Sequence, residues 1–172
     1  ANDQNFKGYR LELGIGHNPD SWKVLTQSAT IRQAEGLYSW DTTGLEGQHS
    51  LKLVVEDFTT DQVVVKRQII VDNTPPQAQI TLPAAQAVVS GNLQIVGTAS
   101  DDHFNSYLLE RGSGINPAAG DWQPIEGLSL TAVNKDALRQ FATTTVADGI
   151  YSLRLKVEDK VGQITTVRRT IT

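Results

Sequence analysis

The sequence predicts an all-β fold of two tandem antiparallel β-sandwich modules, the first lacking its first two strands. Val, Ile and Thr supply 43 of the 172 residues, and such β-branched side chains favour pleated, half-buried surfaces over helices. Apolar and polar residues alternate along short segments, which is the pattern of strands with one buried face. The chain also repeats itself, and a repeat fixes the number of modules more firmly than length does.

Two segments of the chain occur twice. Residues 6–19 and 104–117 share 8 of 14 positions. A second match joins residues 49–57 to 151–159 at an offset of 102 residues. The loops between the matches differ in length. Two copies of one module are therefore predicted.

The module boundaries follow from this duplication. Residues 77–98 carry the first two predicted strands of the second copy and have no counterpart in the first. We expect an N-terminally incomplete module at 1–73, a proline linker at 74–76 and a complete module at 77–172. Paired prolines favour an extended and fairly stiff connection.

A sandwich without two adjacent strands exposes apolar core and unpaired strand edges. Three explanations are open for the first module. The chain is a piece of a longer repeat protein, a neighbouring chain donates the missing strands, or the module closes with fewer strands.

Seven strands are predicted in the second copy. The clearest pattern is at 150–158, where Tyr151, Leu153, Leu155 and Val157 alternate with polar residues. Clusters of Gly, Asn, Asp and Pro mark the turns. A helical turn at 134–138 is the one competitor to an all-β interpretation. The strands are expected near 78–82, 92–99, 106–111, 121–125, 138–145, 150–158 and 163–171.

Composition excludes several kinds of function. The chain has no cysteine, so it has no thiol nucleophile, disulfide or thiolate metal site. A net charge of −4 gives no electrostatic reason to bind nucleic acid. Apolar runs stay far below the roughly 20 residues that a membrane helix needs. We expect no membrane insertion, and a signal peptide that is absent or removed.

Histidine gives no sign of a catalytic centre. The three histidines, His17, His49 and His103, have no histidine at the matching position of the other copy. No serine or carboxylate stands at a spacing that suggests a triad. We therefore expect no enzymatic activity.

Five acidic residues are candidate ligands of an interdomain calcium ion. Asp101 and Asp102 end the second predicted strand, Glu158 and Asp159 end the sixth, and Asp72 precedes the linker. Calcium takes six to eight oxygen ligands, which carboxylates supply well. Aspartates are also common in turns because their side chains bond to nearby backbone, and that alternative stays open. No other cofactor is expected.

Two tryptophans recur at one position of the repeat. Trp22 and Trp122 each follow the first matched segment. Aromatic side chains at repeated positions form either a sugar-binding platform or part of a packed core. Both interpretations are kept.

The run Tyr-x-Leu-x-Leu-x-Val-x-Asp-x-x-Gly from Tyr151 to Gly162 resembles the penultimate strand of fibronectin type III domains. In that family the Tyr hydroxyl pins a neighbouring loop. The wider pattern, with Trp40-Asp-Thr-Thr-Gly-Leu and Asp72-Asn-Thr-Pro-Pro, is similar to the tandem Ig-like or fibronectin type III-like repeats of secreted bacterial surface proteins. The chain departs from it at His49, which replaces the corner Tyr, and at Ala142, where the first copy has Trp40.

The resemblance implies a non-enzymatic extracellular or cell-surface protein. It would serve as a structural spacer or as a subunit of a surface or filament assembly. In the assembly, a neighbouring chain could complete the first module by donating strands. Its partners would be neighbouring copies or other domains of a longer repeat protein. The alternative is an accessory module of a secreted hydrolase that binds carbohydrate or protein, with a glycan or a surface protein as its partner.

Overall fold

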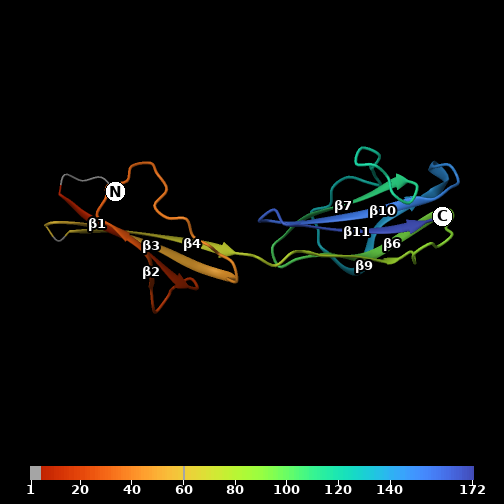
Figure 1. Cartoon of the computed structure of the whole chain (residues 1–172). Coiled ribbons are helices and arrows are strands. Elements are labelled where there is room, and N and C mark those ends of the chain that lie inside the picture. The colour runs from red at the N-terminus through yellow and green to blue at the C-terminus, as the bar shows by residue number, and fades with distance from the viewer. Residues whose placement is uncertain (1–4, 60) are drawn as a thin grey trace. The chain divides into compact units, whose positions relative to one another are not determined.

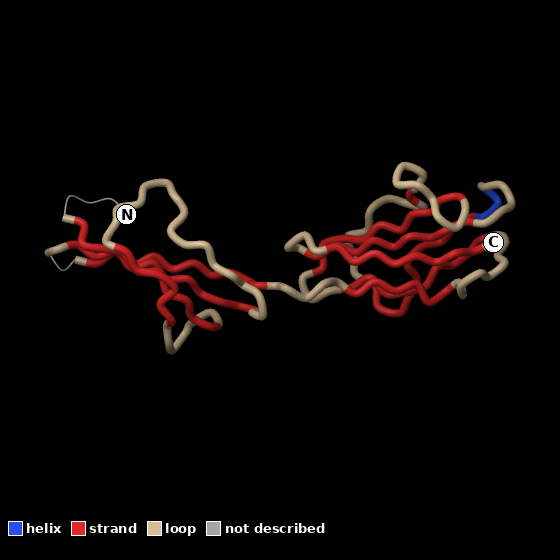
Figure 2. Tube along the Cα trace, viewed as in Figure 1, coloured by secondary structure: helices blue, strands red, loops and turns tan. Residues whose placement is uncertain are grey.

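The computed structural model describes residues 5–59 and 61–172, and it confirms the all-β fold class. Strands dominate the trace (Figure 2). The chain divides into two compact units, Ala1–Thr74 and Pro75–Thr172. Within the described residues, no helix has the length and apolar character needed to cross a membrane.

The first unit is a single antiparallel sheet in the order β2-β1-β3-β4. Residues 29–46, between β2 and β3, bend and turn without forming a strand. In the described part of this unit, no second sheet covers the first. The strands are β1 (Phe6–Ile15), β2 (Lys23–Ser28), β3 (Gly47–Asp57) and β4 (Gln62–Val71).

The second unit is a sandwich of two antiparallel sheets, in the orders β11-β10-β7-β8 and β5-β6-β9. Figure 1 shows β7, β10 and β11 in one layer and β6 and β9 in the other. The strands are β5 (Gln77–Leu82), β6 (Asn92–Ser100), β7 (Phe104–Ser113), β8 (Gln123–Pro124), β9 (Val133–Ala142), β10 (Tyr151–Asp159) and β11 (Ile164–Ile171).

Two details of the second unit go beyond the sequence prediction. The helical turn at 134–138, which was the alternative to the all-β interpretation, does not form, because this segment is part of β9 and pairs with β6. Pairing within a sheet overrides weak local propensity. The strand predicted at 138–145 starts earlier, at Val133, and is followed by a 3-10 turn at Thr143–Thr145.

The core of the second unit lies between its two sheets. Leu153, Leu155 and Val157, which alternate along β10, are each 0% exposed. The buried Tyr107 on β7 spans the layers, since its hydroxyl donates to the Leu138 carbonyl of β9 at 2.7 Å. The remaining members of this buried cluster are Ile80, Ile95, Ala99, Leu109, Phe141 and Ile171.

The sheet of the first unit corresponds strand for strand to one sheet of the second. The order β2-β1-β3-β4 matches β8-β7-β10-β11, and the repeated residues take the same places. A Cβ on Gly14 would lie 2.3 Å from the Pro19 ring, and one on Gly112 would lie 2.5 Å from the Pro117 ring. The repeated Gly and Asn-Pro thus form one tight turn in both units.

The two units differ at the tyrosine corner. The Tyr151 hydroxyl donates to the Ala147 carbonyl at 2.9 Å, as the fibronectin type III resemblance implies. In the first unit His49 takes this place, and its ring meets Trp40 edge-on with the ring centroids 6.1 Å apart. The Nδ1 atom of His49 also lies 3.1 Å from the Gly47 carbonyl oxygen. An aromatic contact and a ring-nitrogen bond to a nearer carbonyl thus stand where Tyr151 bonds Ala147.

We expect Tyr107→Phe to destabilise the second unit by about 1–3 kcal/mol, since it removes a buried hydroxyl that bonds Leu138 and accepts from Arg139. Urea denaturation followed by the NMR signal of the Trp122 indole measures the change. The matched control is Tyr151→Phe, which removes an exposed bond and should cost about 0.5–1 kcal/mol. Equal losses in the two variants would contradict the layer-spanning role of Tyr107.

Candidate interaction surfaces

A cluster of charged and aromatic side chains covers the outer face of the β7–β10 pair. Trp122 is buried at 8% exposure. The Arg154 guanidinium lies 4.1 Å from the Trp122 ring centroid, within the range of a cation–π contact. Arg154 Nε also donates to Glu110 Oε2 at 2.7 Å, and these two residues face each other across the strands. We call this group the outer cluster of the second unit.

The first unit repeats the outer cluster with lysine in place of arginine. The Lys52 ammonium lies 4.3 Å from the Trp22 ring centroid and forms an ion pair with Glu12, its cross-strand partner. Arg10 adds a second cation, whose Nε donates to Glu12 Oε1 at 2.7 Å. Burial opposes ionisation of Glu12, yet the bonds from Lys52 and Arg10 outweigh it. The pKa of the Glu12 carboxyl therefore lies below its ordinary value.

Outer-cluster packing explains why the two tryptophans recur. Each ring packs against a basic side chain from the strand two places along the sheet, Lys52 on β3 for Trp22 and Arg154 on β10 for Trp122. The sugar-binding platform predicted for Trp22 and Trp122 stays a prediction.

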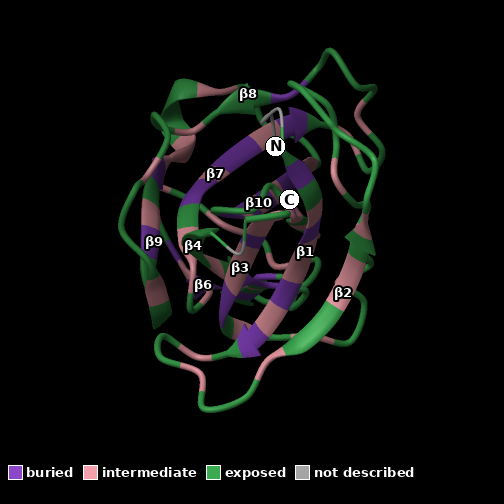
Figure 3. Cartoon of the chain, turned by 90° about the vertical axis from the view of Figure 1, so that its left-hand side faces the viewer, coloured by how far each residue is buried: buried purple, intermediate pink, exposed green. Residues whose placement is uncertain are grey.

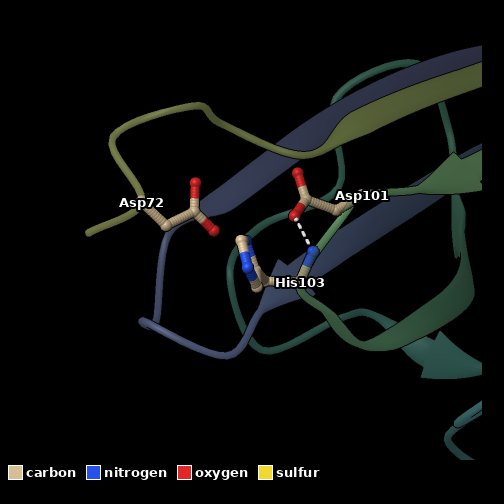
Figure 4. A group of neighbouring side chains, drawn as sticks. All are labelled: Asp72, Asp101 and His103. Atoms are coloured by element: carbon tan, nitrogen blue, oxygen red, sulfur yellow. Dashed lines mark hydrogen bonds between the residues drawn. The ribbon is translucent and has the colours of Figure 1, made fainter. Parts of the chain in front are cut away.

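Two of the predicted calcium ligands stand in the turn after β6. Asp101 Oδ1 accepts the backbone N–H of His103 at 2.7 Å, which closes the turn that leads into β7 (Figure 4). Asp102 is exposed in the same turn. The bond to His103 is the backbone bond that the turn alternative predicts for aspartate.

The other three predicted ligands occupy different environments. Asp159, at the end of β10, is 1% exposed. Its Oδ1 accepts the N–H groups of Val161 and Gln163, each at 2.9 Å, whereas its Oδ2 is buried without a hydrogen-bond partner among the described residues. Glu158 is half-buried on β10. Asp72 belongs to the first unit, where its Oδ1 accepts the Thr74 N–H at 3.2 Å. The calcium site stays a prediction.

One face of the first sheet carries apolar residues that are only partly covered. Leu11, Leu53 and Val55 share this face with β4 residues Val63 and Val65. The first three are half-buried, and Val63 and Val65 are 63% and 40% exposed. Figure 3 shows the first unit toward the viewer, with buried residues on β1 and β3 but none on β2. The sequence predicted missing strands here but not a unit with a single sheet.

Comparisons with known proteins place the chain in no family. No protein-family model matches it, and no curated protein matches it. Among solved structures it is similar to a tetra-tandem repeat in the extending region of a large adhesion protein, with 15% sequence identity and a TM-score of 0.45. That match covers 98% of this chain and 42% of the other.

Acid should weaken the first unit through Glu12. Because its carboxyl pKa is lowered in the folded state, the ionised group stabilises the fold above its ordinary pKa of 4.5, and this stability is lost as the pH falls below that value. Glu12→Gln should be less stable than the parent protein at pH 7. Its free energy of unfolding should also change less between pH 7 and pH 3 than that of the parent.

Urea denaturation followed by the Trp22 indole signal measures both effects. The control is Asp20→Asn, which changes an exposed carboxylate and should follow the parent protein. The Glu12→Gln variant should keep part of the pH dependence of stability, because hydrogen bonding and charge from Arg10 lower the carboxyl pKa of Glu56 as well. A Glu12→Gln profile parallel to that of the parent would show that the ion pairs do not act on stability.

The calcium prediction has a direct test at Asp159. If calcium binds the buried carboxylate, adding millimolar CaCl₂ to chelator-treated protein should raise the melting temperature of the second unit. Asp159→Asn should lose that response while keeping an oxygen to accept from Val161 and Gln163. Calorimetry with and without chelator measures it. Equal melting temperatures in calcium and in chelator would leave Asp159 as a turn residue alone.

Proposed function

We propose that the chain is a non-enzymatic extracellular structural module, which acts as a spacer or as a subunit of a bacterial cell-surface assembly built from neighbouring repeats. One observation supports this above the others. The residues that the two copies share hold the sheet and its turns, and they account for most of the duplication.

Three pairs of repeated residues illustrate this structural use. Ser50 Oγ donates to the Gly16 carbonyl at 2.8 Å, and Ser152 Oγ donates to the Gly114 carbonyl at 2.9 Å. Asp57 and Asp159 each accept two backbone N–H groups in the turn after a strand. Glu12 and Glu110 each bind the basic residue opposite on the next strand. A duplication that preserves a scaffold favours a mechanical role over a catalytic one.

Surface location and neighbouring repeats as partners belong to the same proposal. A chain without cysteine keeps its fold in oxidising and reducing surroundings alike. The alternative role, an accessory module that binds carbohydrate or protein, has no comparable support, because Trp22 and Trp122 already pack in the outer clusters.

A structural spacer should resist pulling along its strands. The first strand of the second unit begins and its last strand ends at opposite poles of the sandwich, so tension acts along β5 and β11 (Figure 1). We expect the second unit to unfold in one step. The chain length gained is the extended length of residues 75–172, about 320–350 Å, minus the distance between the two ends of the folded unit.

Single-molecule force spectroscopy measures this step, and cysteine handles at the two ends attach specifically because the chain has none of its own. Arg169→Ala is the sensitive variant, since Arg169 Nη2 donates to the Ile80 carbonyl and joins β11 to β5. It should lower the unfolding force. Gradual extension of the second unit without a force peak would refute a mechanical role.

A further inference from the structure

The open face of the first sheet carries the same apolar positions that form the core of the second unit. In the second unit Leu109, Leu153 and Leu155 are at most 1% exposed beneath β5, β6 and β9. Their counterparts by strand register are Leu11, Leu51 and Leu53, and all three are half-buried. The second unit thus shows which layer such a face packs against.

Residues 31–40, which precede β3, resemble β9 in backbone conformation and in side-chain pattern. Ala34 has φ 51° and Lys135 on β9 has φ 53°, an unusual conformation for residues other than glycine. With these two aligned, Leu37 and Trp40 fall on Leu138 and Phe141, the two buried apolar residues of β9. They are the two half-buried positions within 31–40.

Residues 31–40 therefore resemble β9 in side-chain pattern and in one strained backbone position. In the second unit β9 is a strand because it pairs with β6, with Phe141 opposite Leu93 and Ala137 opposite Val96. The described part of the first unit has no strand that corresponds to β6. A segment whose strand partner is absent has only its own side chains to order it.

A basic side chain on β4, Arg67, indicates where a strand equivalent to β5 would lie on the first sheet. Arg169 on β11 donates to the Ile80 carbonyl of β5. Arg67 stands at the same register on β4, opposite Leu51 as Arg169 is opposite Leu153. It is exposed, and its Nη1 donates to the carbonyl of its neighbour Lys66 at 3.0 Å. A strand in the position of β5 would present a backbone carbonyl to Arg67.

We propose that a two-stranded hairpin from a neighbouring repeat, with the chemistry of residues 77–100, completes the first unit. Its second strand would pair with 31–40 as β6 pairs with β9. Its first strand would lie over β3 and β4 as β5 lies over β10 and β11. The inference rests on the proposed function in one respect, namely that repeats of this kind adjoin one another.

A hairpin fits this surface better than a second copy of the open face. Two open faces packed together would bury Leu11 and Leu53, but they would leave the backbone of 31–40 without a strand to pair with. The required hairpin has inward apolar residues at the positions of Ile80 and Ile95. It also needs glycine at the position of Gly97, where a Cβ would lie 2.0 Å from the Gln79 carbonyl oxygen.

The test adds a synthetic peptide of residues 77–100 to the 172-residue chain and follows amide hydrogen exchange by mass spectrometry. We expect saturable protection, with exchange in 31–40 slowed by at least about tenfold, because these amides become strand hydrogen bonds. A peptide carrying Ile80→Asp and Ile95→Asp should give no protection, since its inward face is charged.

Two neighbouring variants of β4 locate the binding face. Val65 lies on the open face at 40% exposure, and Val64 lies on the opposite face at 49% exposure. Val65→Asp should abolish the protection by the peptide, and Val64→Asp should leave it unchanged. Circular dichroism of both variants shows whether the sheet remains folded.

Three outcomes would overturn the proposal. They are no protection of 31–40 at millimolar peptide, equal loss of protection in the Val64→Asp and Val65→Asp variants, and self-association of the chain without peptide that Val65→Asp abolishes. The last outcome would assign the face to a second copy of the chain. None of them affects the single-step unfolding of the second unit under force, so failure of the hairpin and failure of the proposed function are distinguishable.

Discussion

The need to cover the apolar face of a β-sheet organises this molecule. A sheet with alternating apolar residues is stable in water only when a second layer removes that face from solvent. In the second unit β5, β6 and β9 provide the layer, and three core residues of β10 reach 0% exposure. In the described part of the first unit the same kind of sheet stands without such a layer, and Val63 and Val65 remain 63% and 40% exposed. The contrast arises from one missing layer, because the sheets themselves correspond strand for strand.

The opposite faces of the two sheets show a different principle. There the strands carry charged residues, and in each outer cluster a cation pairs with a carboxylate and also packs against an indole ring. Glu12 pairs with Lys52 and Glu110 pairs with Arg154, each directly across two adjacent strands. Cross-strand pairs of opposite charge support a sheet locally. This face is therefore complete within each unit, whereas the apolar face depends on another layer.

Sequence periodicity predicted the strands best where one face is buried and the other wet. The alternation in residues 150–158 located β10 to within one residue at each end. It located β9 poorly, because Asn134, Lys135 and Asp136 are polar and their place in a strand comes from pairing with β6. The short β8 has the same cause, since its two residues are fixed by pairing with β7. Contacts between distant segments decide such elements, and no local pattern reports them.

The duplication in the sequence also contained information about the outer clusters and about residues 31–40. The outer clusters were detectable, because an acidic residue recurs at positions 12 and 110 and a basic one at positions 52 and 154. Aligned strands place these charges opposite each other, which explains their joint repetition. The relation between 31–40 and β9 was harder to see, since it requires an offset of 101 residues rather than 102 and becomes clear only from the positive φ of Ala34 and Lys135.

The way the two copies diverged also follows from what covers each sheet. Tyr151 can bond Ala147 because the chain before β10 is held by the 3-10 turn at Thr143–Thr145, which in turn follows a paired β9. In the first unit the segment before β3 forms no strand, and the His49 ring contacts Trp40 while its Nδ1 lies 3.1 Å from the Gly47 carbonyl oxygen. An aromatic contact tolerates a wider range of geometry than a hydrogen bond. The His49–Trp40 contact is thus suited to a segment whose backbone is not set by a sheet, and it keeps that segment close to the face that a second layer would occupy.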